Sequence, residues 1–385
     1  MTPMLRPSSL AVVLFLMLTP TATALQSDPF SDVLYRGNLQ RTGEQDGPGL
    51  TGDPLLRWRF QTGGPIVVSP ILVDGVVYVG SWDHNLYALE EATGEIRWVF
   101  RAGAGFFSSP AYHQGVLFAG GNDGVLYAID AETGLEKWRF KADEPIWSSP
   151  ALVDGLLVVG GIDGFVYGLE SESGELLWKI DTEGMIWASS PAVDDGVAYI
   201  GASAIDTEGK GRVMAIDLKA GTEKWSVFTH GGIYNSPAVA EGNVYVASQD
   251  GTLHAYDEAT GDEVWSLNES GGYGSSPAIS QGMVYVSTRD GYLERIDATN
   301  GTRLWRLHYS RKLGSSPAVV GDLTYVVNNN GELWAVNTVD GQPKWGYPTG
   351  SEAAGSPVVF DGVVYVGTGK HNLGEGEGFL YAISS

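Results

Sequence analysis

Two segments interrupt an otherwise regular sequence, at 204–212 and 370–378, and both carry acidic side chains that could hold a metal ion. The acidic residues are Asp206, Glu208, Glu375 and Glu377. Calcium prefers oxygen ligands such as carboxylates, but neither segment has the spacing of a known calcium-binding loop. We therefore interpret both segments as solvated loops and predict no metal site in the chain.

The chain has no cysteine, which removes several kinds of chemistry. Without a thiol there can be no disulfide, no thiolate metal site and no cysteine nucleophile. His84 stands where the following repeat has Gly124, and histidine tolerates a left-handed backbone better than most residues. We interpret His84 as a turn residue, and no group of side chains in the sequence predicts a catalytic centre.

A set of aromatic residues, with one basic pair, could instead bind a partner. The aromatic residues precede a series of Ser-Pro pairs by three or four positions, and the basic pair lies near the matching place in a later repeat. The set is Phe106, Phe107, Trp147, Trp187, Tyr234, Tyr273, Arg311 and Lys312. Aromatic rings beside positive charge could hold a peptide or a flat ligand, although rings also plug hydrophobic channels.

The elements that position these residues belong to a repeated sequence. The segment 128–138, AIDAETGLEKW, occurs in seven copies that share a tight turn and a tryptophan, and six of the seven begin with a small residue. The tryptophans are Trp98, Trp138, Trp178, Trp225, Trp265, Trp305 and Trp345, and five of the six steps between them are 40 residues long. A constant period of that size indicates a propeller or a solenoid.

Each repeat has the pattern of four short strands separated by three turns. Turn pairs such as Asp74-Gly75 and Asp123-Gly124 accept the positive φ of a hairpin turn. In the segments between such pairs, hydrophobic residues occupy alternate positions, as expected for strands. The Ser-Pro pair lies in the first strand, and proline cannot donate a hydrogen bond to a neighbouring strand. We therefore expect the first strand to be innermost, with one unpaired edge along a central channel.

The two ends of the chain complete one repeat between them. Residues 55–60, LLRWRF, form an alternating strand whose Trp58 precedes Trp98 by 40 positions, whereas the last repeat, 356–385, stops before a tryptophan strand of its own. We predict an all-β, eight-bladed β-propeller of four-stranded blades, closed by pairing 55–60 with the last blade. The eight tryptophans, Trp58 included, should dock between neighbouring blades.

The repeated frame A-x-D-x-x-T-G-x-x-x-W resembles the tryptophan docking motif of the pyrroloquinoline quinone (PQQ) repeat over about residues 51–385. The resemblance implies an eight-bladed propeller with one of two functions. Family dehydrogenases oxidise alcohols or sugars with PQQ and a calcium ion held by Glu, Asn and Asp side chains. The BamB-like propeller of outer-membrane assembly is instead a non-catalytic scaffold that holds proteins by its loops.

The sequence favours the scaffold. Many family dehydrogenases pack a vicinal cysteine pair over the quinone and are much longer, whereas this chain has no cysteine and little sequence outside its ring. We predict a non-catalytic interaction scaffold in the cell envelope, with a protein or peptide partner, no cofactor and no catalytic residue. The alternative is a dehydrogenase with PQQ and calcium, whose cofactor-binding residues the sequence does not identify.

The N-terminus predicts export. Arg6 precedes an apolar run, 10–18, that is too short to span a bilayer, and Ala22-Thr23-Ala24 fits a cleavage site. We interpret 1–24 as a signal peptide and 25–50 as an extended leader lying on the propeller, 51–385.

The mature protein should be a monomeric periplasmic or extracellular propeller. Because no N-terminal cysteine is present, a lipid anchor of the usual kind is excluded. The net charge of −23 disfavours nucleic acid and anionic membrane surfaces as partners. The segments 204–212 and 370–378 replace the same turn of opposite blades, so they could flank a partner bound at the aromatic set.

Overall fold

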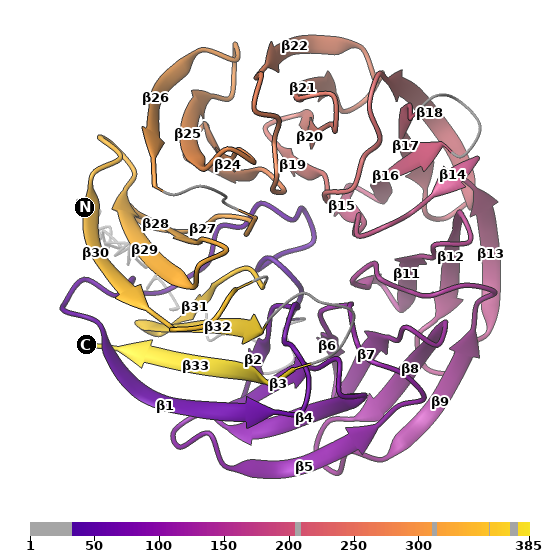
Figure 1. Cartoon of the computed structure of the whole chain (residues 1–385). Coiled ribbons are helices and arrows are strands. Elements are labelled where there is room, and N and C mark those ends of the chain that lie inside the picture. Colours follow the sequence, from indigo (N-terminus) through magenta and orange to yellow (C-terminus); the bar gives the residue numbers. More distant parts are fainter. Residues whose placement is uncertain (1–32, 205–208, 310–313, 354, 370–375) are drawn as a thin grey trace, which may run out of the picture. The chain divides into compact units, whose positions relative to one another are not determined.

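A computed structural model of the chain describes residues 33–204, 209–309, 314–353, 355–369 and 376–385. All the regular elements in these residues are β-strands, and they form eight antiparallel sheets arranged as the blades of a ring (Figure 1). The predicted fold class is therefore confirmed. The predicted signal peptide and the first residues of the leader lie outside the described residues.

The first four blades follow the repeat in chain order, from the innermost strand outward. Blade 1 contains β2 (Ile71–Val73), β3 (Val76–Gly80), β4 (Asn85–Glu90) and β5 (Ile96–Arg101). Blade 2 contains β6 (Ala111–His113), β7 (Val116–Gly120), β8 (Val125–Asp130) and β9 (Glu136–Lys141). Blade 3 contains β10 (Ala151–Val153), β11 (Leu156–Gly160), β12 (Phe165–Glu170) and β13 (Leu176–Asp181). Blade 4 contains β14 (Gly184–Met185), β15 (Ala192–Asp194), β16 (Val197–Ala204), β17 (Gly211–Asp217) and β18 (Thr222–Thr229).

The last four blades complete the circle. Blade 5 contains β19 (Ala238–Ala240), β20 (Asn243–Ala247), β21 (Thr252–Asp257) and β22 (Glu263–Asn268). Blade 6 contains β23 (Ala278–Ser280), β24 (Met283–Ser287), β25 (Tyr292–Asp297) and β26 (Arg303–His308). Blade 7 contains β27 (Ala318–Val320), β28 (Leu323–Val327), β29 (Glu332–Asn337) and β30 (Pro343–Pro348). Blade 8 contains β31 (Val358–Phe360), β32 (Val363–Gly369), β33 (Gly378–Ser384) and, from the other end of the chain, β1 (Leu55–Thr62).

Both ends of the chain build blade 8. β1 pairs antiparallel with β33, with Leu55 opposite Ser384 and Thr62 opposite Gly378 (Figure 1). The predicted closure of the ring is therefore confirmed, and no sheet edge is left open at the seam. Blade 4 differs from the prediction because β16 runs on to Ala204 and pairs there with the additional strand β14.

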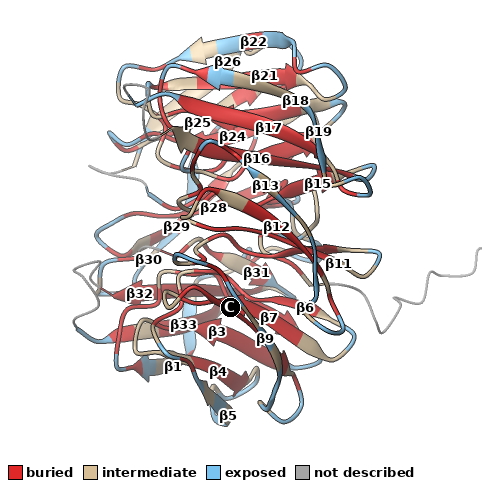
Figure 2. Ribbon diagram, turned by 90° about the vertical axis from the view of Figure 1, so that its right-hand side faces the viewer, coloured by how far each residue is buried: buried red, intermediate tan, exposed pale blue. Residues whose placement is uncertain are grey.

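The core lies between neighbouring blades. The second strand of a blade is almost entirely buried, and β3 is buried along its whole length, whereas the outer strand has half-buried and exposed positions that alternate, as in β5 (Figure 2). This alternation follows from the pleat, because successive side chains of a strand point to opposite faces. Only one face of each outer strand can therefore pack against the next blade.

Every blade carries a tryptophan in its outer strand; seven of the eight donate to the next blade, and Trp345 of blade 7 donates to the leader. Trp138 donates its Nε1–H to the carbonyl of Ser171 at 3.1 Å, and its ring lies against Gly174, where a Cβ would approach within 2.5 Å. Ala128 stands opposite Trp138 in the sheet. The remaining indole donors and carbonyl acceptors are Trp58 to Glu91, Trp98 to Ala131, Trp178 to Leu218, Trp225 to Glu258, Trp265 to Ala298, Trp305 to Thr338 and Trp345 to Leu50.

Replacing Trp138 with alanine should destabilise the propeller by about 2–3 kcal/mol. Full burial of a large ring would give a loss of about 3–5 kcal/mol, but the Trp138 ring is only half-buried. Equilibrium urea unfolding followed by circular dichroism would measure the loss. An unfolding midpoint identical to that of the wild type would show that this ring is not wedged between blades.

Candidate binding site at the mouth of the channel

A belt of serines surrounds the channel. The backbone N–H of Ser109 donates to Ser149 Oγ at 3.1 Å, and that of Ser149 donates to Ser190 Oγ at 2.9 Å. The serine belt consists of Ser69, Ser109, Ser149, Ser190, Ser236, Ser276, Ser316 and Ser356, and its eighth link runs from Ser69 Oγ to the Ser356 carbonyl. The serine of each Ser-Pro pair therefore joins blades inside the ring, as the tryptophan does outside.

The leader covers one end of this channel. Four consecutive innermost strands donate backbone N–H groups to it, from Val193 to Leu39, Val239 to Gln40, Ile279 to Thr42 and Val319 to Gly43, at 2.7–2.9 Å. These bonds use the strand edge that the Ser-Pro pairs leave unpaired. Further along the leader, the carbonyl of Leu50 accepts the indole N–H of Trp345, a contact that the turn before the tryptophan makes in other blades.

Two arginines of the leader are buried in this end of the channel. Arg41 is fully buried and donates to the carbonyls of Tyr35, Ser149, Pro150 and Pro191. Arg36 is 5 % exposed and donates to the carbonyls of Arg41, Ser276 and Pro277. Through these and other backbone oxygens, such as those of Tyr112 and Pro48, the leader is bonded to blades 2 to 8 of the ring, which no side-chain pattern reveals.

A central cavity of about 390 Å³ lies between the leader and the opposite mouth of the channel. Tyr35 of the leader and the hydroxyl-bearing serines line its inner part. Phe107, Trp147, Tyr234 and Glu352 line it toward the mouth, and Glu352 is the only charged residue among the described residues of the lining. The cavity therefore opens on one face of the propeller, between aromatic rings.

These rings belong to a row that follows the mouth, which we name the aromatic arc: Trp82, Phe107, Trp147, Trp187 and Tyr234. Successive ring centroids lie 5.9, 4.5, 5.5 and 6.0 Å apart, and the closest pair, Phe107 and Trp147, is stacked at an interplanar angle of 25°. Trp147 also donates its Nε1–H to Asn122 Oδ1 at 2.5 Å. The rings are thus held side by side before any ligand arrives.

The sequence matches one known protein family over most of its length. A family model described as outer membrane protein assembly factor BamB matches residues 51–105, 101–231 and 209–377, which is most of the chain. The chain belongs to this BamB family. A search of curated proteins finds no match.

Solved structures similar to this BamB-family chain share its fold at low identity. BamB from Moraxella catarrhalis is 19% identical with a TM-score of 0.72, over 85% of this chain and 99% of that one. A europium-containing methanol dehydrogenase is 17% identical with a TM-score of 0.81, over 94% and 99%. Quinohemoprotein alcohol dehydrogenase from Comamonas testosteroni is 16% identical with a TM-score of 0.76, over 91% and 80%. Identities this low establish the propeller fold alone.

The structure brings together some of the predicted rim residues of this BamB-family chain and separates others. Phe107, Trp147, Trp187 and Tyr234 lie in the aromatic arc, which also contains Trp82. Arg311 and Lys312 lie outside the described residues.

Phe106 and Tyr273 are fully buried in the packing between blades, so their placement on the rim was wrong. The cause is the alternation of extended backbone. Phe106 and Phe107 are neighbours, and neighbouring side chains point to opposite sides. Tyr273 occupies the inward position of its repeat, equivalent to that of Phe106, and the next residue is a glycine.

The acidic segments give no metal site in the part of the chain that is described. Asp206, Glu208 and Glu375 lie outside that part, whereas Glu377 is exposed. Within it, no group of three or more His, Cys, Asp or Glu side chains is placed to hold a metal ion. His84 has a φ of 76°, as expected for a turn residue.

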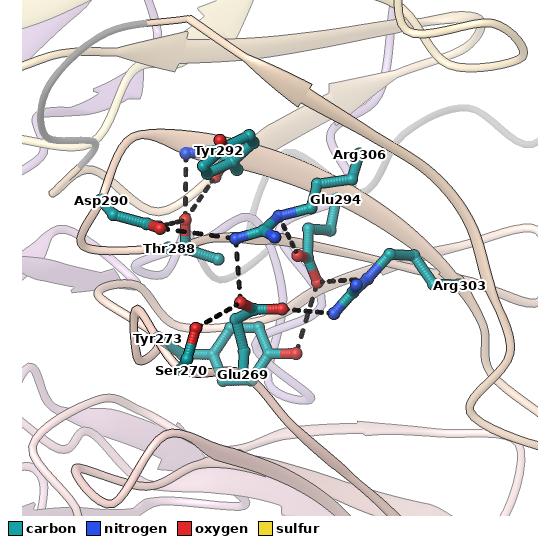
Figure 3. Close-up of polar contacts among 9 residues, drawn as sticks. All are labelled: Glu269, Ser270, Tyr273, Thr288, Asp290, Tyr292, Glu294, Arg303 and Arg306. Carbon is teal, nitrogen blue, oxygen red and sulfur yellow. Dashed lines mark hydrogen bonds and ion pairs between the residues drawn. The ribbon is translucent and has the colours of Figure 1, made fainter.

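A buried ionic cluster joins blades 5 and 6 of the BamB-family propeller (Figure 3). Glu294, which is fully buried, lies 3.2 Å from Arg303 Nε and 3.0 Å from Arg306 Nε, and it accepts a hydrogen bond from the Tyr273 hydroxyl at 3.3 Å. Glu269 of the neighbouring blade pairs with the same two arginines at 2.6 and 2.9 Å. The carboxylates of Glu294 and Glu269 are both buried, so the cluster is suited to hold blades together rather than to bind a partner.

The sequence carries a signal for this cluster. Glu294 stands at the strand position that Tyr127 occupies in blade 2, and its neighbour Arg295 replaces the small residue found at Ala128. A carboxylate at this inward strand position indicates a buried pair, because an isolated buried charge is too costly. Arg306 stands opposite Glu294 in the sheet of blade 6, whereas the pairing of Glu269 with the same arginines depends on the packing of blade 5 against blade 6.

Proposed function

We propose that this protein is an exported, non-catalytic propeller that holds a protein partner in the cell envelope. The observation that supports the proposal most directly is the aromatic arc, a row of rings at the mouth of a cavity. Large aromatic side chains that are partly open to solvent are typical anchors of protein interfaces. Tyr234 is 41 % exposed at one end of the arc.

Membership of the BamB family agrees with this role, since the family is described as an outer membrane protein assembly factor. An envelope location would follow from the signal peptide predicted from the sequence. No helix in the described residues has the length and apolarity needed to cross a membrane. We infer that the protein acts as a monomer, because β1 pairs with β33 and leaves no open sheet edge at the seam of the ring.

The alternative is a PQQ-dependent dehydrogenase. Its support is the fold that the chain shares with methanol and alcohol dehydrogenases. The lining of the cavity gives this alternative less support than the scaffold. A calcium-dependent quinone centre needs several carboxylate and amide oxygens around one ion, whereas the described lining contains a single carboxylate, Glu352, with the amides of Asn235 and Asn329. No three acidic or histidine side chains converge elsewhere in the described residues.

Purified protein incubated with PQQ and calcium should show no dye-linked oxidation of alcohols or aldoses. The physical reason is the lack of a carboxylate set that would hold the ion against the quinone. The measurement is the rate of dye reduction, with a quinone-loaded dehydrogenase as positive control. Turnover above the rate of free PQQ with calcium would overturn the scaffold proposal in favour of the enzyme.

A further inference from the structure

The central cavity has one open end. The leader covers the other end, where Arg41 is fully buried and Arg36 is 5 % exposed. A ligand must therefore enter past the aromatic arc and stop at Tyr35, which lines the inner end. A cavity of about 390 Å³ is at the small end of ligand sites and suits a side chain or the end of a polypeptide rather than a folded loop.

The covered end is electropositive. Arg36 and Arg41 hydrogen-bond to carbonyl oxygens, and neither forms an ion pair with a carboxylate in the described residues. The Arg41 guanidinium lies 5.5 Å from the centre of the Tyr35 ring, so the charge is next to a residue that lines the cavity. Burial lowers the pKa of Arg41 to about 9, which leaves the group positively charged at neutral pH.

The wall of the cavity offers hydrogen-bond donors. Seven serines of the belt accept a backbone N–H at Oγ, and the six of them that line the cavity donate their hydroxyl protons to no acceptor among the described residues. The six are Ser109, Ser149, Ser190, Ser276, Ser316 and Ser356. A group that only accepts hydrogen bonds, and that carries negative charge, is the complement of such a wall.

The mouth is asymmetric. Blades 2 to 5 place aromatic side chains at the rim, whereas the equivalent positions of blades 6 and 7 are Gly274 and Gly314. A partner polypeptide that enters beside Gly274 and Gly314 has room there for its backbone. Its side chains would then face the aromatic rings of blades 2 to 5.

We propose that the central cavity receives the C-terminal end of a partner polypeptide, with its free carboxylate at the serine belt and an apolar or aromatic last side chain against the aromatic arc. This inference rests on the proposed function and gives the partner's chemistry. A C-terminus is selected over an N-terminus because the inner end offers serine hydroxyl donors with the buried Arg41 beside Tyr35, whereas the one carboxylate of the described lining, Glu352, lies toward the mouth.

Calorimetric titration of the full mature protein with two tripeptides tests this inference. The probes are N-acetyl-Gly-Ala-Phe with a free carboxylate and the same peptide with a C-terminal amide. We expect the acid to bind at least about tenfold more tightly than the amide, because only the acid complements the positive inner end. Equal affinities, or no binding of the acid at millimolar concentration, would overturn the proposal.

Two variants locate the binding. Ala188→Trp fills the cavity from its wall and should abolish binding of the acid, whereas Phe360→Ala, at an exposed position on the opposite face, should leave it unchanged. Unchanged binding to Ala188→Trp would also overturn the proposal. If a partner is captured at the arc while acid and amide bind equally, the carboxylate site fails but the scaffold stands; quinone turnover would remove both.

Discussion

Replacing Trp345 with alanine is expected to destabilise the propeller by about 3–5 kcal/mol, the usual range for removing a large buried ring. Trp345 is 8 % exposed, packs with Tyr325 at a centroid distance of 5.9 Å and donates to the Leu50 carbonyl at 2.8 Å. The substitution removes packing and also releases the leader from blade 7. Equilibrium unfolding in guanidinium chloride would measure the loss.

Trp187→Ala provides the matched control. Trp187 is also a tryptophan, but it is only half-buried and its ring lies in the aromatic arc, against Trp147 and Tyr234. Its removal should lower the free energy of unfolding by about 1–2 kcal/mol, less than the loss for Trp345→Ala. Equal losses in the two variants would contradict the assignment of one ring to blade docking and the other to the rim.

Replacing Glu294 with alanine should destabilise the fold by about 3 kcal/mol. Arg303 and Arg306 would each lose a partner in a place where water cannot fully replace it. The loss stays at the low end of the range for broken buried pairs because both arginines keep about a quarter of their surface exposed. Glu294→Gln keeps the shape and a hydrogen-bond acceptor, so it should lose less; a greater loss would contradict this explanation.

The wild type and Glu294→Gln should also differ in how their stability depends on pH. Burial raises the pKa of the Glu294 carboxyl, because desolvation outweighs the attraction of the two arginines. Between the unfolded pKa and the higher folded pKa, the native state binds more protons than the unfolded state, so stability falls as the pH rises. Wild type should therefore lose stability relative to Glu294→Gln as the pH rises above the unfolded pKa of a glutamate, about 4.3. A difference that is constant with pH would contradict the raised pKa.

The blades and the closure of the ring could be predicted because both depend on sequence-local signals. The tryptophan recurs at a fixed period, glycine marks each turn, and Trp58 fills the place that the last repeat lacks. The rim was predicted less well. Phe106 and Phe107 satisfied the same spacing rule, and only the direction of each side chain, fixed by the pleat, separates core from rim.

The covered end of the channel could not be predicted from side-chain patterns. Arg41 is held by backbone carbonyls from blades 3 and 4, and any sequence supplies carbonyls. The leader has no periodicity, so its path over four innermost strands is decided by the unpaired edges that the ring presents. The resulting cavity with one open end depends on tertiary packing. The presence of Tyr35 and Arg36 in the sequence therefore does not predict it.

Site-specific photo-crosslinking tests the central proposal most directly. A benzoylphenylalanine residue in place of Tyr234, at the aromatic arc, is compared with one in place of Phe360, which is 45 % exposed on the opposite face. Irradiation in cells of the source organism should give a discrete adduct with an envelope protein from position 234 and none from position 360. Adducts from position 360 alone, or none from either position, would contradict a scaffold that holds its partner at the mouth of the channel.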